Sequence, residues 1–265
     1  MVVTGTLNDG FIRDDLRIIH QFAAAVTHEL ARTPAPGGRV LGRVTRVALN
    51  VALFLRKMWR NDVRVVVFWF AVANYAPVLA WLAKRLGARV VVITGGQDAV
   101  YVPEIDWGDM KRPRHRRGFN RLMKLADAVL PFSDSARAII AERDDPRRIR
   151  TAYPSIDTRF FAPAGAARAR RIVTCCYQYG AVTIVQKGLD QLVAAARLLP
   201  DEEFVIVGDP VDERGREFAA SAPPNVRFLP RIPSRAAYRE FLAGSSVYAQ
   251  LSAHEGFGVS AAEAM

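Results

Sequence analysis

The chain has 265 residues, of which 51% are apolar and 24% charged, a balance that is typical of globular proteins and excludes fibrous and disordered classes. The formal net charge of +11 favours partners with negative charge, such as nucleic acid, an anionic membrane surface or a phosphorylated ligand. The two cysteines, Cys175 and Cys176, are adjacent, which excludes a disulfide framework and predicts buried structural thiols in a reducing compartment.

The first half of the chain alternates predicted strands with predicted helices. Runs of β-branched and aromatic residues predict strands, and apolar residues three or four apart predict helices. The predicted strands cover residues 2–6, 63–70, 88–94, 128–133 and 150–153, and the predicted helices cover 16–32, 39–59, 119–125 and 135–143, with another starting at Pro77. Residues 99–118 are predicted to form a long loop.

The uncharged stretch between Arg64 and Lys84 is close to the length that spans a bilayer. Asn74 and Pro77 interrupt it near its middle, and its two parts differ in composition. The first part is β-branched and aromatic, whereas the second is rich in Ala and Leu. We therefore predict a buried strand, a turn and a helix with Pro77 in its first turn, in place of a membrane span.

The alternation of strands and helices restarts after a linker rich in Pro, Ala and Gly at residues 154–170. Strands are predicted at 171–177, 203–208, 225–230 and 245–252, and helices at 188–199, 213–221, 234–244 and from about 258. Two successive runs of this kind predict an α/β fold of two doubly wound parallel sheets, with domains at 1–163 and 164–265. Ligands bind such sheets at the carboxyl ends of the strands.

Two features of the second half carry candidate chemistry. Lys187 and Gly188 stand at the entrance to a predicted helix, where a cation and free N–H groups could meet an anion; the alternative is a solvated lysine before a glycine turn. The chain ends on "HEGFGVSAAEAM", with Glu255 and Glu263 on either side of a glycine-rich turn that follows a predicted strand. The chain has no G-x-G-x-x-G or P-loop stretch, which argues against dinucleotide oxidoreductases and P-loop enzymes.

These stretches resemble a known family. "KGLDQLVAAARLLPDEEFVIVG", "NVRFLPRIP" and "LSAHEGFGVSAAEAM" resemble, in order and spacing, the nucleotide-sugar-binding domain of glycosyltransferase family 4. "ADAVLPFSDSARAII" and "IRTAYPSIDTRFFAP" look like the end of that family's N-terminal domain. The resemblance implies the GT-B architecture, two Rossmann-like domains that face a cleft, with an acceptor-side domain at 1–163 and a donor-binding domain at 164–265. It also implies a retaining transferase that uses a nucleotide-diphosphate sugar, with no metal and no cofactor.

The resemblance also implies roles for individual residues. Glu255 corresponds to the glutamate that contacts the donor sugar, and Lys187 to the lysine that neutralises the diphosphate leaving group. Glu263 corresponds to the glutamate that holds the ribose. The remaining positions implied in substrate binding are Gly188 beside the lysine, Gly256, Phe257 and Gly258 at the sugar and diphosphate, Leu229 and Arg231 near the base, and Asp98 on the acceptor side.

Two positions, and the point where the chain stops, depart from the family's pattern. Ala181 stands where the family usually has a second phosphate-binding arginine. Gly95 stands where an N-domain histidine is common, and Asp98 remains as the candidate acceptor contact. The chain stops soon after Glu263 with four predicted strands in the second domain, so that we expect an incomplete second sheet and a C-terminally truncated chain.

The segment 111–124 holds seven Lys and Arg residues and no acid. A solvated loop is one interpretation, and a surface that meets anionic lipid headgroups or a phosphorylated acceptor is the other. Nucleic acid is not an expected partner, because the segment has one aromatic residue besides its histidine and no nucleic-acid-binding fold is recognised. The opening residues lack the pattern of a signal peptide, so we expect a cytoplasmic protein, peripheral on the inner face of the membrane.

The leading hypothesis is therefore a glycosyltransferase that moves a sugar from a nucleotide-diphosphate sugar to a glycan or lipid-linked acceptor. A second hypothesis is a non-catalytic sugar-nucleotide-binding remnant or partner subunit with the same fold. A third is a basic membrane-binding protein without ligand chemistry, which would leave the series from Lys187 to Glu263 unexplained.

Overall fold

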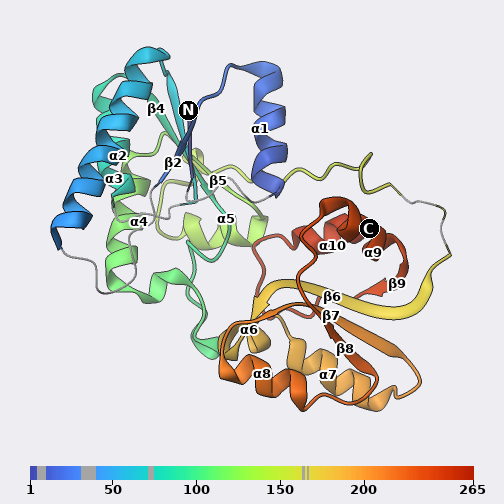
Figure 1. Ribbon diagram of the computed structural model, residues 1–265. Coiled ribbons are helices and arrows are strands. Elements are labelled where there is room, and N and C mark those ends of the chain that lie inside the picture. Colours follow the sequence, from blue (N-terminus) through green and yellow to red (C-terminus); the bar gives the residue numbers. More distant parts are fainter. Residues whose placement is uncertain (5–9, 31–39, 71–74, 163–164, 166) are drawn as a thin grey trace. The chain divides into compact units, whose positions relative to one another are not determined.

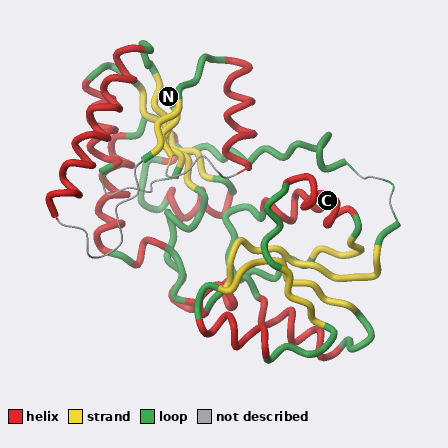
Figure 2. The backbone as a smooth tube through the Cα atoms, in the orientation of Figure 1, coloured by secondary structure: helices red, strands yellow, loops and turns green. Residues whose placement is uncertain are grey.

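The computed structural model describes residues 1–4, 10–30, 40–70, 75–162, 165 and 167–265. Contacts between Cα atoms divide the chain into two compact units. Unit 1 is Met1–Tyr101 with Gly108–Ser155, and unit 2 is Val102–Trp107 with Ile156–Met265. Each unit has its own sheet with helices packed beside it (Figures 1 and 2). The predicted domain boundary, between residues 163 and 164, lies outside the described residues.

Unit 1 is built on a five-stranded parallel sheet in the order β2-β1-β3-β4-β5. Its strands are β1 (Val2–Thr4), β2 (Thr27–Glu29), β3 (Val65–Trp69), β4 (Arg89–Thr94) and β5 (Ala128–Pro131). Its helices are α1 (Gly10–Phe22), α2 (Val40–Arg60), α3 (Ala76–Arg85), α4 (Pro113–Leu125) and α5 (Asp134–Ala141), with 3-10 turns η2 (Asp109–Lys111) and η3 (Pro146–Arg148). The order of the strands requires α2, α3 and α4 to lie on one face of the sheet and α1 on the other, as Figure 1 shows.

The packing of α3 shows how sequence pattern produces this layer. Leu79, Ala80 and Ala83 recur on one side of the helix and are fully buried. Helix α3 contacts β4, in which Val90 and Val92 are also fully buried. Burying one such side chain stabilises the fold by roughly 1.5–3 kcal/mol.

Unit 2 is built on a four-stranded parallel sheet in the order β8-β7-β6-β9. Its strands are β6 (Ala169–Tyr179), β7 (Glu203–Pro210), β8 (Val226–Leu229) and β9 (Ser245–Tyr248). Its helices are α6 (Ala181–Gln186), α7 (Leu189–Leu198), α8 (Glu213–Ala220), α9 (Arg235–Ala243) and α10 (Val259–Ala264), with one 3-10 turn, η1 (Pro103–Ile105). Strand β9 lies at an edge of the described sheet.

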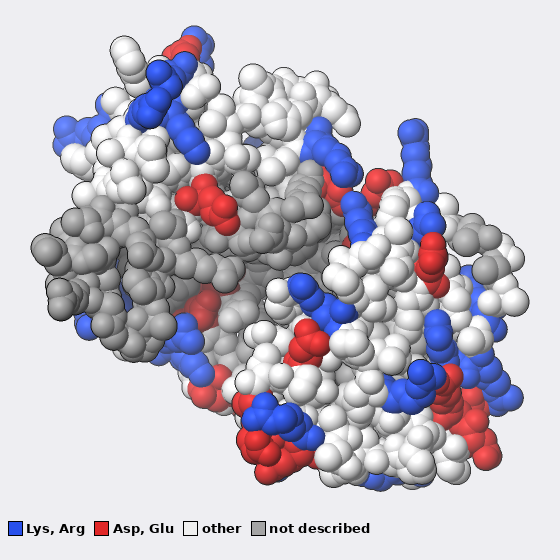
Figure 3. Space-filling model, viewed as in Figure 1, with Lys and Arg blue, Asp and Glu red and all other residues white. Residues whose placement is uncertain are grey.

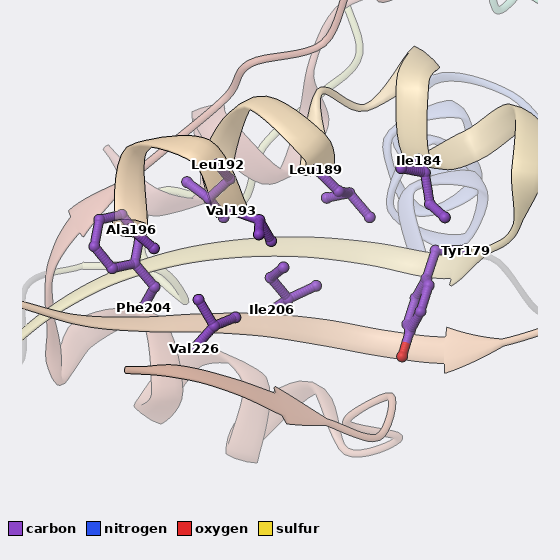
Figure 4. Close-up of a cluster of buried hydrophobic side chains, with 9 residues drawn as sticks. All are labelled: Tyr179, Ile184, Leu189, Leu192, Val193, Ala196, Phe204, Ile206 and Val226. Carbon is purple, nitrogen blue, oxygen red and sulfur yellow. The ribbon is translucent and has the colours of Figure 1, made fainter. Parts of the chain in front are cut away.

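Helix α7 packs on this sheet through one apolar side (Figure 4). Leu189, Leu192 and Val193 are buried at the spacing of one helix face. They meet Phe204 and Ile206, which alternate along β7 and are also buried. This cluster fixes the start of α7 relative to the carboxyl ends of the strands, where ligands are expected.

Three predicted elements of unit 1 differ from the structure. The predicted helix 16–32 is wrong beyond Phe22, because Thr27–Glu29 forms the edge strand β2 beside β1. The predicted loop 99–118 is wrong from Pro113, which begins α4 as a first-turn proline. The first turns of α4 carry exposed basic residues, so they showed no apolar period.

The predicted strand 150–153 forms no ladder, although the segment runs beside β5. Arg150 and Ala152 donate backbone hydrogen bonds to the carbonyl groups of Val129 and Pro131, at 3.0 and 2.9 Å. Pro131 has no N–H group to donate in return, so that the pairing stops at a single bridge between Val129 and Ile149.

The uncharged stretch after Arg64 folds as predicted into a strand, β3, and a helix, α3. Pro77 lies in the first turn of α3, whereas the predicted interruption at Asn74 lies outside the described residues. In the part of the chain that the structure describes, no helix is long and apolar enough to cross a membrane.

Candidate functional site

The candidate site is built at the carboxyl edge of the sheet in unit 2. Strands β6 and β9 are parallel neighbours, so the segments that follow them start at the same edge. After β6 the chain turns through α6 to Lys187 and Gly188, and after β9 it runs through the segment 249–258. These two segments carry most of the residues that the sequence singled out.

Gly188 brings the two segments into contact. Its φ of +63° is left-handed, and a Cβ atom at this position would lie 2.1 Å from the carbonyl oxygen of Leu251. Only glycine allows this close approach and this conformation together. The residue before it, Lys187, is thereby held next to the loop that contains Glu255.

Gln186 adds two hydrogen bonds between the same segments. Its buried side chain donates from Nε2 to the carbonyl oxygen of His254, at 2.8 Å. Its own carbonyl oxygen accepts a hydrogen bond from the N–H group of Ala253, at 2.9 Å. The position of the loop after β9 is therefore fixed by α6 as well as by the sheet.

Glu255 is the centre of a polar cluster. Its Oε1 atom forms an ion pair with the Nζ atom of Lys187. The same oxygen accepts hydrogen bonds from Gln250 Nε2 at 2.9 Å and from Ser252 Oγ at 2.8 Å. The side chains of Lys187 and Glu255 are 28% and 25% exposed, so the pair is partly shielded from water but open to a ligand. The structure thus joins the two residues predicted to be catalytic.

The glycine-rich turn follows directly. Gly256 is buried, and Gly258 has a left-handed φ of +85° at the start of α10. The N–H groups of Ala261 and Ala262 donate to the carbonyl oxygen of Gly258, at 3.0 and 3.1 Å. Phe257 lies half-buried between the two glycines. The turn sends the chain from Glu255 into a helix, as the spacing of the two glutamates predicts.

Glu263 lies in different surroundings from Glu255. It stands on α10 and lines a small cavity of about 80 Å³, which Arg168, Arg239 and Tyr248 also line. Burial raises the pKa of Cys175 to about 12, and the negative charge of Glu263 adds to the effect. The predicted role of Glu263 at the ribose stays a prediction.

A second cation lies at the carboxyl edge near the end of β8. Arg231 is exposed, and its guanidinium group stacks on the ring of Tyr177 at 4.4 Å. Its N–H group donates to Asp209 Oδ1 at 3.2 Å, which ties it to the end of β7. Leu229, at the end of β8, is half-buried against the core around Val173.

The Cys176 thiol is influenced by charges from both Lys187 and the end of β7. Burial raises the pKa of Cys176 to about 11, the charge of Lys187 lowers it, and the charge of Asp209 raises it. The charges of Lys187 and of Asp209, which accepts a hydrogen bond from the backbone N–H of Arg231, therefore act on the pKa of this thiol in opposite directions. Both cysteines are free and half-buried, so the prediction of buried structural thiols is corrected to partly covered thiols.

Ala181 takes the place of the expected arginine at the start of α6. The residue is exposed, and its N–H group donates to Asp212 Oδ2 at 3.0 Å. Asp212 also caps α8 through the N–H group of Gly215, at 2.8 Å. At Gly180 a Cβ atom would lie 2.4 Å from Asp212 Oδ2, so this glycine makes room for the carboxylate.

Asp98 belongs to unit 1 and lies just after β4. It is 4% exposed, and its Oδ1 atom accepts hydrogen bonds from the N–H groups of Gly95 and Gly96, at 3.0 and 3.1 Å. His115 of α4 donates a hydrogen bond from Nε2 to the backbone carbonyl oxygen of Asp98, at 2.8 Å. Asp98 thus shapes the turn at the carboxyl end of β4, and its contact with an acceptor stays a prediction.

Sequence reasoning missed several members of the polar cluster. Gln250 and Ser252 lie just after β9, which ends at Tyr248, whereas the predicted strand 245–252 contained both residues, so inspecting the end of that strand did not reach them. Gln186 and Tyr177 carried no such signal, because their partners come from distant segments. His254 packs against Trp107 at 5.2 Å between ring centroids and is partly buried. Among the described residues, no group of three or more His, Cys, Asp or Glu side chains could hold a metal ion.

Comparison with known proteins places this geometry in a family. Residues 177–265 match the family model described as "Glycosyl transferases group 1". This part of the chain is similar to the glycosyl transferases group 1 family. The match begins near the end of β6 and includes Lys187, Glu255 and Glu263. A search of the curated proteins found no match.

Solved structures share the fold of the whole chain. Sucrose-phosphate synthase from Thermosynechococcus elongatus matches 90% of this chain with a TM-score of 0.68 and 16% identity. Anabaena HepE, solved in complex with UDP, matches 99% with a TM-score of 0.63 and 19% identity. S. aureus TarM, also solved with UDP, matches 81% with a TM-score of 0.62 and 14% identity.

These similarities confirm the predicted α/β fold class of GT-B type, with two parallel sheets. At such identities they show the fold alone. The chain spans 43% of the length of TarM, 62% of sucrose-phosphate synthase and 70% of HepE.

Proposed function

We propose that the protein is a retaining, metal-independent glycosyltransferase that takes its sugar from a nucleotide-diphosphate sugar. The observation that carries the proposal is the cluster of Lys187, Glu255, Gln250 and Ser252 at the carboxyl edge of the sheet in unit 2. The family match over residues 177–265 supports the same activity.

In the proposed mechanism, Lys187 passes from Glu255 to the diphosphate of the donor. The negative charge that builds on the leaving phosphate attracts the ammonium group more strongly than the single carboxylate does. Glu255 then keeps Gln250 and Ser252 as hydrogen-bond donors, and its carboxylate stays in place to contact the sugar hydroxyls. Removing one group that stabilises transition-state charge typically costs about 3 kcal/mol, or roughly a hundredfold in rate.

Arg231 is our candidate for the second cation that Ala181 does not supply. Its stacking on Tyr177 and its backbone bond to Asp209 hold it at the carboxyl edge. A guanidinium group binds phosphate through two parallel hydrogen bonds, which suits a diphosphate. In this proposal Leu229 flanks the base, Glu263 holds the ribose, and the turn from Gly256 to Gly258 faces the sugar.

The acceptor is proposed to be a glycan or a lipid-linked molecule that binds unit 1, with Asp98 near it. We also propose that the protein works at the cytoplasmic face of a membrane. The support is helix α4, on which Arg114, Arg117 and Arg121 recur three or four residues apart and are exposed. Each basic residue at an anionic membrane surface contributes about 1 kcal/mol of attraction. Figure 3 shows other Lys and Arg side chains interspersed with Asp and Glu on the face in view.

The alternative is a sugar-nucleotide-binding protein without turnover, and one observation favours it. The position of the expected arginine, Ala181, is exposed and its N–H group is occupied by Asp212. Such a protein would bind the nucleotide through Lys187 and lack the charge needed to drive the departure of the phosphate.

A donor hydrolysis screen with UDP-, GDP- and ADP-sugars tests the proposal. We expect one donor to be hydrolysed slowly, and Lys187→Ala to lower that rate about a hundredfold. The control is Lys84→Ala, which removes a lysine of an ion pair with Asp127 in unit 1. Nucleotide binding without hydrolysis of any donor would favour the alternative. An equal rate of hydrolysis in the wild type and in Lys187→Ala would contradict the proposed site.

A further inference from the structure

Unit 1 contains a cavity that the proposed function does not use. It has a volume of about 260 Å³ and lies between α4 and α5, next to the turn after β4. Its volume is near the lower limit of small-molecule pockets, roughly 300 Å³, and exceeds the roughly 150 Å³ apolar cavity known to bind benzene. It is large enough for one slender ligand.

The wall of the cavity is apolar. Phe119 and Met123 come from α4, Ile139 and Ile140 from α5, and Ala99 from the turn after β4. All except Ile139 are buried, so their positions are fixed by the core of unit 1. An alkyl chain fits such a wall, because each methylene group that leaves water contributes about 0.8 kcal/mol.

The polar lining of the cavity is mainly cationic. Lys124 and Arg143 are exposed and line it together with Asn120 and Asp144. Asp144 forms an ion pair with Arg148, so its charge is balanced locally. The Oδ2 atom of Asp144 is buried without a hydrogen-bond partner in the described residues, which disfavours an anion at that corner. A negative headgroup would therefore lie toward Lys124 and Arg143.

The basic face of α4 leads to this cavity. Arg114, Arg117, Arg121 and Lys124 follow one another along the same side of the helix, and the last of them lines the cavity. Positive charge along a surface raises the local concentration of anions and speeds their association. The same helix thus provides an attractive surface and an apolar wall.

We propose that the cavity between α4 and α5 binds a single alkyl chain that carries an anionic headgroup. The chain lies against Phe119, Met123 and Ile139, and the headgroup pairs with Lys124 and Arg143. The ligand comes either from a bilayer lipid or from a lipid-linked acceptor, which share this chemistry. Ala99 is the neighbour of Asp98, so a chain held here lies beside the turn that carries the candidate acceptor contact.

Calorimetric titration with decyl phosphate, kept below its micelle concentration, tests this site in the full chain. We expect saturable binding at one site, and no binding of inorganic phosphate at the same concentrations. Ile139→Trp fills the cavity and should weaken the binding of decyl phosphate at least tenfold. Ala138→Trp puts the same side chain on an exposed position of α5 and should leave the affinity within twofold.

A second pair of variants tests the headgroup without filling the cavity. Lys124→Glu should weaken the binding of decyl phosphate at least fivefold, whereas Arg60→Glu, at the exposed end of α2 and outside the lining of the cavity, should change it less than twofold. Equal affinity of wild type, Ile139→Trp and Lys124→Glu would overturn the proposal. So would inorganic phosphate that competes as well as decyl phosphate.

Vesicles of anionic phosphatidylglycerol distinguish the two sources of the chain. If the source is the bilayer, Ile139→Trp weakens vesicle binding along with decyl phosphate binding. If the source is a lipid-linked acceptor, Ile139→Trp weakens the binding of decyl phosphate but leaves the binding of vesicles unchanged. Neither assay contains a nucleotide, so a negative result here leaves the proposed donor site in unit 2 untouched.

Discussion

One oxygen atom, Glu255 Oε1, accepts hydrogen bonds from three side chains. Lys187 comes from the segment after β6, and Gln250 and Ser252 come from the segment after β9. Such redundancy allows one donor to leave while the carboxylate keeps its position. It gives a physical reason why a lysine can serve both as a partner of Glu255 and as a phosphate ligand.

Gly188→Ala should destabilise unit 2 by at least about 2 kcal/mol. A left-handed alanine alone costs roughly 1–2 kcal/mol, and its Cβ atom would meet the carbonyl oxygen of Leu251 at 2.1 Å. Gly165→Ala is the matched control, because Gly165 has a φ of +64° with no atom within 4 Å of the added Cβ. Denaturant unfolding of both variants gives the difference, and an equal loss of stability would show that the contact with Leu251 does not matter.

Glu263→Ala should weaken binding of the bare nucleotide at least tenfold, whereas Glu255→Ala should mainly lower turnover. The reason is the proposed pairing of Glu263 with ribose hydroxyls, since hydrogen bonds to a charged group contribute about 1.5–3 kcal/mol. Calorimetry with the nucleotide and initial rates with the donor separate the two effects. Glu217→Ala, on the exposed surface of α8, is the control. Unchanged nucleotide affinity in Glu263→Ala would rule out the ribose assignment.

At the level of elements, β2 is joined to α2 by a buried histidine. His28 Nε2 donates to Asn50 Oδ1 at 2.6 Å, and the imidazole ring meets Phe54 edge-on at 5.6 Å. Burial lowers the pKa of His28, the hydrogen bond with Asn50 opposes this in part, and the charge of Lys57 lowers the pKa slightly further. The neutral ring is therefore the form that the folded protein favours.

Unit 1 should lose stability as the pH falls below about 6.5, the ordinary pKa of histidine. The folded pKa of His28 is lowered, so the unfolded chain binds more protons in that range, and stability rises with pH. The stability that neutral His28 contributes is fully present above its pKa in the unfolded chain and is lost as the pH falls toward its pKa in the folded protein. Hydrogen exchange of β2 and α2 at pH 7.5 and 5.5 measures it. His28→Gln should flatten the dependence, and the exposed His20→Gln should not; a wild type insensitive to pH would refute the assignment.

Helix α4 should attract the protein to anionic vesicles. Replacing Arg114, Arg117 and Arg121 by Glu should weaken binding at least a hundredfold at low salt, since each basic residue contributes about 1 kcal/mol. Added salt should weaken wild-type binding, because screening shortens the range of the attraction. Vesicle sedimentation measures both effects.

The control for this experiment has the same change in net charge. It replaces by Glu three exposed arginines of unit 2, namely Arg214, Arg216 and Arg227. Equal losses in the two triple variants would mean that net charge, and not the face of α4, determines binding.

Across the whole molecule, the sequence predicted features that depend on local pattern. The alternation of strands and helices and the burial of one side of α7 could both be anticipated, whereas Lys187 and Glu255 were assigned separate roles through the family resemblance, and their ion pair was not predicted. The edge strand β2 could not, since three residues show no period and their strand geometry comes from pairing with β1. The first turns of α4 were not predicted as helix, because their exposed arginines show no apolar period. Residues 150–153 have the pattern of a strand, but Pro131 lacks the N–H group that a ladder with β5 requires.

Residues that act through partners distant in sequence were also beyond prediction. Gln186 and Tyr177 acquire their roles only when α6 meets the segment after β9 and β6 meets the end of β8. The cavity between α4 and α5 likewise depends on how two helices pack, which no local pattern records. A parallel sheet brings such segments together at its carboxyl edge, so its topology is the missing information.

The most direct test of the account is calorimetric titration of the full chain with UDP, GDP and ADP. We predict that one of the three binds with a one-to-one stoichiometry. Lys187→Ala should weaken that binding at least tenfold, as expected for a lost charge-assisted contact of about 1.5–3 kcal/mol, while Lys84→Ala should leave it within twofold. Binding of no nucleotide, or equal affinity in wild type and Lys187→Ala, would contradict the assignment of the carboxyl edge of unit 2 as a nucleotide-sugar site.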